Sequence, residues 1–268
     1  MKSESPIGIF DSGIGGTSIW QEIRALLPLE HTIYLSDSKN APYGQKTKEE
    51  IVNLSIKNTE FLLENNCKII VVACNTATTN AIKVLREKYD VPFIGIEPAI
   101  KPASLKTKNN VIGILATKGT LNSELFEKTS SSLESDITII EQVGEGLVDL
   151  IENDELNSLK MDYLLNKYLT PMKQANTDCI VLGCTHYPYL KQKIQDIVGT
   201  DITIIDSGYA VALQTKRVLE NLKLSNKKEE VKKMLEVKYT FYINKNKNTL
   251  GKILKNYATE IEIIEHNF

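Results

Sequence analysis

The chain has 268 residues, of which 42% are hydrophobic and 25% charged, a composition typical of a globular protein with a substantial core. Its formal net charge of −2 argues against a general affinity for nucleic acid or other polyanions. The N-terminal MKSESPIGIF lacks a long apolar segment, and later apolar runs are only strand-sized, so we expect no signal peptide, no membrane span and a cytoplasmic protein with reduced cysteines.

Short apolar runs alternate with helix-length stretches along the chain. The runs predict strands at 7–10, 31–37, 69–74, 92–96, 111–117, 136–142, 179–184, 201–206, 238–244 and 261–266. The stretches between them predict helices that include 47–66, 76–89, 155–175 and 208–223. Several strands are continuously apolar, which is typical of strands covered on both faces. The pattern therefore predicts an α/β fold with mostly parallel sheets.

An internal similarity suggests that one unit occurs twice. IGIFDSGIGGTS begins at residue 7 and IGILATKGTLNS at residue 112, and in each copy a cysteine ends a later strand. Chance likeness between strand ends is the alternative. We expect two pseudo-symmetric lobes, each a mostly parallel sheet flanked by helices, with the active site in the cleft between them. The first lobe would be discontinuous, residues 1–97 plus 208–268, and the second would be residues 98–207.

One basic segment departs from the near-neutral balance. Residues 216–255 hold twelve Lys or Arg and four Glu. No aromatic interleaving or recognised nucleic-acid motif accompanies them, so we interpret the segment as a solvated surface and expect no nucleic-acid partner.

The four cysteines fall into two kinds. Cys67 and Cys179 lie at the starts of strands, away from the expected cleft, and are predicted to pack in the core. Cys74 and Cys184 end their strands and precede helical patterns, where a helix N-terminus would favour the thiolate and lower the thiol pKa. There is no C-x-x-C pair, so neither a zinc knuckle nor a thioredoxin-like site is predicted, and no metal site is expected.

Two thiols facing one cleft suit a particular chemistry. A disulfide does not fit a reducing compartment, and a cysteine hydrolase needs only one thiol. Two opposed thiols fit two opposed proton transfers, in which one thiolate removes a proton from a carbon and the other thiol returns one to the opposite face. Such a reaction inverts a stereocentre.

Other polar residues could assist this chemistry. His186 lies two residues from Cys184 and could share its proton, and Asp11 could do the same beside Cys74, although helix capping would also explain this Asp. Glu152 could orient His186 or be exposed to solvent. The glycines after Asp11 match no phosphate-binding motif and are interpreted as allowing close approach to a ligand. Neutral donors for carboxylates come from Asn75, Thr76, Thr117, Thr120 and Thr185.

Six motifs spread over the chain resemble those of one known family. They are FDSGIGG (10–16), APYG (41–44), ACNTAT (73–78), GIEPAIKPA (95–103), LATKGT (115–120) and LGCTHYP (182–188). Together they resemble the glutamate racemases of the cofactor-independent aspartate/glutamate racemase superfamily. Aspartate racemases and maleate isomerases, which also use paired cysteines, are alternatives. A two-lobed protein that binds an amino acid without catalysing a reaction is a further alternative.

The resemblance implies interconversion of L- and D-glutamate without pyridoxal phosphate or another cofactor, supplying D-glutamate for peptidoglycan. It implies that Cys74 and Cys184 are the paired acid and base and that Asp11, Glu152 and His186 assist them. It further implies a substrate site lined by Asp11, Ser12, Pro42, Tyr43, Gly44, Asn75, Thr76, Thr117, Thr120, Thr185 and His186. Homodimers are common in that family, but nothing in the sequence fixes an arrangement.

Overall fold

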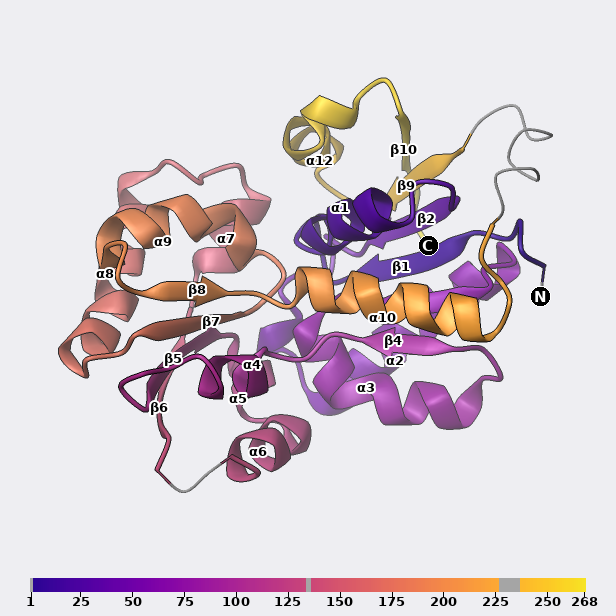
Figure 1. Ribbon diagram of the computed structural model, residues 1–268. Helices are drawn as coiled ribbons and strands as arrows, with labels where there is room; N and C mark the ends of the chain where they lie inside the picture. The colour runs from indigo at the N-terminus through magenta and orange to yellow at the C-terminus, as the bar shows by residue number, and fades with distance from the viewer. Residues whose placement is uncertain (1, 134–135, 227–236) are drawn as a thin grey trace.

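The computed structural model describes residues 2–133, 136–226 and 237–268, which form two parallel sheets flanked by helices (Figure 1). The six-stranded sheet has the order β10-β9-β2-β1-β3-β4. Its strands are β1 (Ile7–Asp11), β2 (Thr32–Ser36), β3 (Ile69–Val72), β4 (Phe93–Gly95), β9 (Tyr239–Ile243) and β10 (Ile261–Glu265). The four-stranded sheet has the order β6-β5-β7-β8. It consists of β5 (Val111–Ala116), β6 (Thr138–Val143), β7 (Cys179–Gly183) and β8 (Thr203–Ile205).

Every strand pairing within these sheets is parallel, which confirms the predicted α/β class. The two sheets also share an arrangement. The block β2-β1-β3-β4 has the same order as β6-β5-β7-β8, so β1 corresponds to β5 and β3 to β7. The similar segments beginning at residues 7 and 112 lie on β1 and β5, and Cys74 and Cys184 follow β3 and β7. The topology thus supports two copies of one unit.

Side chains alternate between two buried faces of the six-stranded sheet. Ile69 and Val71 pack in the core formed with α1 (Thr17–Leu26) and α10 (Gly208–Asn221). Ile70 and Val72 pack in the core formed with α2 (Lys48–Glu64) and α3 (Asn75–Lys88). Because both faces are covered at β3, this strand is apolar and buried throughout, and this accounts for the continuous run in the sequence.

The four-stranded sheet is covered in the same way. Leu115, Ile180 and Leu182 pack with α8 (Leu159–Gln174) and α9 (Lys191–Val198). The opposite face packs with α4 (Ile100–Ser104) and α6 (Glu124–Ser131). Shorter helices connect or flank the sheets: α5 (Lys118–Leu121), α7 (Leu147–Glu152), α12 (Lys247–Ile253), and the 3-10 turns η1 (Tyr43–Gln45), η2 (Tyr187–Leu190) and η3 (Lys255–Tyr257).

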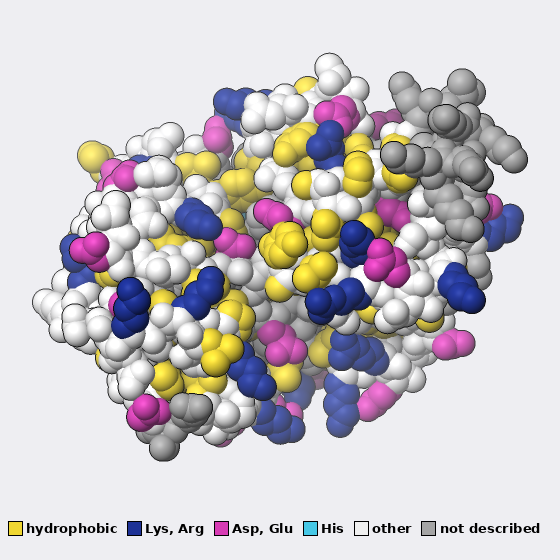
Figure 2. Space-filling model, in the orientation of Figure 1, with side chains coloured by type: hydrophobic (Ala, Val, Ile, Leu, Met, Phe, Trp, Pro, Cys, Tyr) yellow, Lys and Arg dark blue, Asp and Glu magenta, His cyan; other side chains and the backbone are white. Residues whose placement is uncertain are grey.

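The chain passes between the sheets twice, from β4 to α4 and from β8 to α10 (Figure 1). The lobe boundaries at residues 97/98 and 207/208 stay a prediction. Of the basic segment 216–255, residues 227–236 lie outside the described residues. Acidic and basic side chains are interspersed over the face drawn in Figure 2. Among the helices that the structure describes, none has the length and apolar character needed to cross a membrane.

Candidate active site

Cys74 and Cys184 line one small cavity between the two sheets. Both thiols are almost fully buried, with 4% and 6% exposure. Because the carboxyl ends of β3 and β7 meet here, equivalent positions of the two sheets deliver the two sulfur atoms to one space. The remaining lining residues are Ser12, Pro42, Tyr43, Gly44, Asn75, Thr76, Thr117, Val148, Thr185 and His186.

Cys74 is the N-cap residue of α3. Its Sγ accepts a hydrogen bond from the N–H of Ala77 at 3.4 Å and lies 3.6 Å from Ser12 Oγ, to which the thiol donates. The expectation of a lowered pKa is nevertheless wrong for this thiol. Burial, followed by the nearby Asp11 carboxylate, raises the pKa of Cys74 and outweighs the helix amide and the Ser12 hydroxyl.

Cys184 follows β7 directly but does not cap an α-helix. The 3-10 turn η2 comes next, and α9 begins only at Lys191. The polar neighbour of this thiol is instead an imidazole, because His186 Nδ1 lies 3.8 Å from Cys184 Sγ. The two thiols therefore occupy equivalent positions in the fold but differ in their partners.

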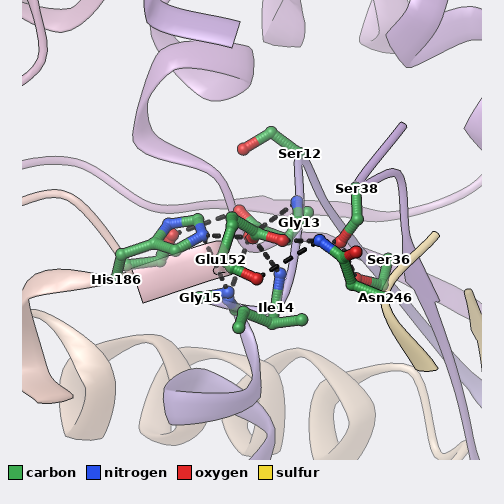
Figure 3. Close-up of polar contacts among 12 residues, drawn as sticks. Ser12, Gly13, Ile14, Gly15, Ser36, Ser38, Glu152, His186 and Asn246 are labelled. Atoms are coloured by element: carbon green, nitrogen blue, oxygen red, sulfur yellow. Dashed lines mark hydrogen bonds and ion pairs between the residues drawn. The ribbon is translucent and has the colours of Figure 1, made fainter. Parts of the chain in front are cut away.

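His186 is buried beside the Glu152 carboxylate, which lies at the end of α7 (Figure 3). Nε2 and Oε1 are 2.7 Å apart, so a hydrogen must lie between them, since two bare acceptors would repel at that distance. The Gly15 nitrogen also lies 3.2 Å from Nε2, but an Nε2 that donates to Glu152 cannot accept the Gly15 N–H. Burial disfavours the charged ring, but hydrogen bonds to Cys184 and Glu152 outweigh it and hold the pKa of His186 well above its ordinary value.

Asp11, at the end of β1, joins the glycine loop to the loop that carries Cys184. Its Oδ2 accepts the N–H groups of Gly13 and Gly16 at 3.1 and 3.0 Å, and its Oδ1 accepts the hydroxyl of Thr185 at 3.1 Å. Gly16 is the N-cap residue of α1, so this carboxylate also orders the start of that helix. Burial raises the pKa of Asp11 against the lowering effects of His186 and the loop amides.

The glycine loop makes room for side chains from the other sheet. A Cβ atom on Gly13 would lie 1.9 Å from Glu152 Oε1, and one on Gly15 would lie 2.2 Å from His186 Nδ1. We interpreted these glycines as allowing close approach to a ligand. In the structure, the absence of a Cβ atom allows the side chains of Glu152 and His186 to approach the loop.

Hydroxyl groups also meet across the cavity. Thr76 Oγ1 lies 2.8 Å from Thr117 Oγ1, and Thr120 Oγ1 lies 3.3 and 3.0 Å from those two atoms. Thr120 does not itself line the cavity. Asn75 differs from these residues, because its amide nitrogen and oxygen are buried without a hydrogen-bond partner in the part of the chain that the structure describes.

The APYG segment forms another wall. Pro42, Tyr43 and Gly44 line the cavity, and the Tyr43 hydroxyl donates to Asp37 at 2.5 Å and accepts from Asn58 at 3.1 Å. Burial and the Asp37 carboxylate raise the pKa of Tyr43 well above its ordinary value, so its phenol stays neutral.

Some residues at the site were not expected from the sequence. Val148 lines the cavity one helical turn before Glu152, and that spacing within α7 is the available signal. Ser38 and the N–H of Ile14 bind the Glu152 carboxylate, but neither contact leaves a signal in the sequence. No group of three or more metal-binding side chains occurs in residues 2–133, 136–226 and 237–268.

A second pocket adjoins the cavity on its outer side. It has a volume of about 290 Å³ and shares Pro42, Gly44, Thr117 and Val148 with the inner cavity. Its other walls come from η1, the start of α5, the segment that joins β6 to α7, and α7 itself, and they include the charged side chains of Lys118, Glu145 and Asp149.

The family model for Asp/Glu/Hydantoin racemase matches residues 17–215. Curated glutamate racemases from Ralstonia pickettii and Herpetosiphon aurantiacus are 47% and 46% identical, over 81% and 83% of this chain and 77% and 88% of theirs. Among solved structures, glutamate racemase RacE1 from Bacillus anthracis is 29% identical with a TM-score of 0.86, covering 99% of this chain and 98% of its own. Glutamate racemase from Francisella tularensis in complex with D-glutamate is 27% identical with a TM-score of 0.84, at the same coverage.

The family match spans most of the chain, and the structural likeness extends over nearly all of it. The sequence motifs, the paired sheets and the relatives all agree. This chain belongs to the Asp/Glu/Hydantoin racemase family, with glutamate racemases as its relatives, and is an amino-acid racemase.

Proposed function

We propose that this racemase interconverts L- and D-glutamate by two proton transfers, with Cys74 and Cys184 as the paired acid and base. The observation that carries the proposal is that both thiols line one small cavity from opposite sheets. Each sulfur comes from the equivalent strand end of its sheet, which suits approach to a single carbon from two sides.

The chemistry balances with these two groups alone. One thiolate sulfur takes the proton from Cα, and the electron pair of the broken C–H bond spreads into the substrate carboxylate. The other thiol then gives its proton to the opposite face of the carbon. The enzyme ends with the proton on the sulfur that began without it, and no cofactor is needed.

The weak acidity of the Cα proton is the main barrier, because an ionised carboxylate already carries negative charge. The cavity supplies donors where that charge would grow: the Asn75 amide and the hydroxyls of Thr76, Thr117 and Thr185. The unpartnered amide of Asn75 supports a substrate contact at this place, since a buried polar group without a partner is unfavourable in the free protein.

The two halves of the site are unequal in their proton chemistry. Cys184 has a basic partner in His186, which Glu152 supports, so the thiol proton can pass to the imidazole. Cys74 has Ser12 and a helix amide, and burial disfavours its thiolate. The two sulfur atoms therefore differ in the groups with which each can exchange a proton.

Two related structures support glutamate as the substrate: glutamate racemase from Francisella tularensis is in complex with D-glutamate, and that from Escherichia coli is in complex with L-glutamate and the activator UDP-MurNAc-ala. We propose that the product D-glutamate serves peptidoglycan synthesis in the cytoplasm. A homodimer also remains a proposal.

Incubation with L-glutamate in deuterated water tests the function. Incorporation of deuterium at Cα together with formation of D-glutamate is the expected result. Unchanged L-glutamate would reduce the protein to a binding role. Turnover of L-aspartate with none of L-glutamate would transfer the assignment to aspartate.

A further inference from the structure

Ser38 lies on the opposite side of Glu152 from His186 (Figure 3). It follows β2 by two residues and is 3% exposed. The Oγ of Ser38 donates to Glu152 Oε2 at 2.8 Å, and it lies 3.1 Å from Ser36 Oγ. A line of polar contacts therefore runs from Ser36 through Ser38 and Glu152 to His186, and from there to Cys184.

The hydrogens along this line have a single consistent direction. Glu152 Oε1 accepts from Ile14 N–H and from the imidazole, each at 2.7 Å. Within the described residues, Ser38 supplies the hydrogen bond recorded for Oε2. A hydroxyl has one hydrogen to give, so Ser38 gives it to the carboxylate and receives one from Ser36.

We propose that Ser38 is a positioning residue for proton transfer at Cys184, acting through Glu152 and His186; the idea rests on the two-thiol function proposed above. The hydroxyl fixes the orientation of a buried carboxylate and stabilises its charged form. Without it, Oε2 would be a buried acceptor with no partner, so the carboxylate would turn toward another donor. This rotation weakens the contact with Nε2 and therefore the ability of Nδ1 to hold the Cys184 proton.

This effect belongs to one half of the reaction. Cys74 contacts Ser12 and the Ala77 amide and takes no part in the line from Ser38. Loss of the Ser38 hydroxyl should therefore raise the barrier for transfer at Cys184 and leave the barrier at Cys74 unchanged. The equilibrium constant between enantiomers is one, so kcat/KM must fall equally in both directions. Isotope effects can nevertheless distinguish the two faces.

The test uses Ser38→Ala with L- and D-glutamate, each with hydrogen or deuterium at Cα. We expect kcat/KM to fall roughly 10- to 100-fold, as for loss of a hydrogen bond to a charged group. The deuterium isotope effect on kcat/KM should rise for the enantiomer whose proton Cys184 removes and fall for the other. Cys74→Ser identifies that enantiomer, because it keeps Cα exchange only on the Cys184 side. Ser38→Thr retains a hydroxyl and should restore much of the loss.

Ser55→Ala is the matched control, since Ser55 is fully buried and its hydroxyl bonds Ile51 O within α2. It should leave both isotope effects unchanged. If Ser38→Ala matches this control in rate, or slows both directions with unaltered isotope effects, Ser38 is only structural and the proposal is wrong. If Ser38→Ala does not fold, Ser36→Ala is the deciding variant. We expect its isotope effect to rise for one enantiomer and fall for the other, as for Ser38→Ala but by less. The absence of these changes overturns the proposal. A parent enzyme inactive on glutamate would instead refute the proposed function.

Discussion

Glu152 Oε1 and His186 Nε2 lie 2.7 Å apart, and the same oxygen accepts the N–H of Ile14 from the loop after β1. The carboxylate and the imidazole come from segments that follow strands of the four-stranded sheet, whereas Ile14 belongs to the six-stranded side. The apposition of the two sheets thus helps to form the charged centre of the site. Changes on either side should alter the acidity of this imidazole.

Replacing Glu152 with Gln should lower the pKa of His186. The carboxylate is one of the groups that hold the imidazole protonated above its ordinary pH range, and an uncharged amide cannot do so. The chain has three histidines, so the ring signal of His186 can be followed by NMR across pH. We expect the titration midpoint to move to lower pH, with activity reduced about 10- to 100-fold. An unchanged midpoint would contradict the assigned contact.

The four cysteines should separate into two groups on mutation to Ser. Cys74→Ser and Cys184→Ser should each reduce turnover at least about 1,000-fold, because each removes one of two required proton carriers. Each variant should retain slow Cα exchange of one enantiomer, measured in deuterated water, because the remaining thiol can still support it. Cys67→Ser and Cys179→Ser lie in the core clusters and should retain most activity. Parent-like turnover by Cys184→Ser would exclude the two-thiol mechanism.

Replacing Gly13 with Ala should reduce activity far more than it reduces stability. The new Cβ would lie 1.9 Å from Glu152 Oε1, so the carboxylate must move away from His186. We expect activity to fall at least about 100-fold, with a stability loss of about 1–3 kcal/mol. Gly251→Ala in α12 is the control, because the nearest atom to its added Cβ is 4.0 Å away. Retained activity in Gly13→Ala would show that Glu152 does not need its present position.

Asn75→Ala should weaken substrate binding at little cost to the free protein. Both polar atoms of the Asn75 side chain lack partners among the described residues, so removing them breaks no hydrogen bond there. We expect KM for glutamate to rise about tenfold and the free energy of unfolding to change by less than about 1 kcal/mol. Asn65→Ala is a useful contrast, because that amide bonds Phe61 O at the end of α2 and its loss should reduce stability alone. An unaltered KM would remove Asn75 from the substrate site.

We expect the buried thiol of Cys67 to make the folded protein less stable at alkaline pH. Burial raises the pKa of Cys67 from an ordinary 9.0 to about 12, so between these values the folded state binds a proton that the unfolded state has lost. The stabilisation is complete below pH 9 and lost as pH rises through about 12. At pH 10 the parent should have lost about 1.4 kcal/mol that Cys67→Ala does not lose. Urea unfolding of both proteins at pH 8 and pH 10 measures the difference, and parallel changes would argue against it.

The sheets could be predicted from the sequence because their strands are buried on both faces. The run Ile69–Val72 is apolar at every position for this reason, and the equivalent loops after β3 and β7 followed from the repeated pattern. Chain order and strand ends thus predicted that Cys74 and Cys184 meet at one cavity, whereas Val148 was not expected there and Thr120 does not line it. They could not identify the hydrogen-bond partners and neighbouring charges of each residue.

The pKa of Cys74 illustrates the limit. A helix N-terminus is visible in the sequence, and the helix amide does bind the sulfur. The opposing effects of burial and Asp11 depend on packing between distant segments, and they prevail. Ser38 was missed for a related reason, because a serine after a strand is also a common turn residue, and its contact with Glu152 spans 114 residues of sequence.

The unequal surroundings of the two sulfur atoms also concern what happens between turnovers. Under the proposed mechanism, an enzyme molecule that has converted one enantiomer ends with its proton on the other sulfur. In that state it cannot convert a second molecule of the same enantiomer. Water must then exchange that proton before the next cycle. Because an imidazole lies beside Cys184, whereas Cys74 contacts Ser12 and the Ala77 amide, this recovery is favourable in one direction of the reaction and unfavourable in the other. At high substrate concentration, the two enantiomers should therefore differ in maximal rate even though their overall equilibrium is even.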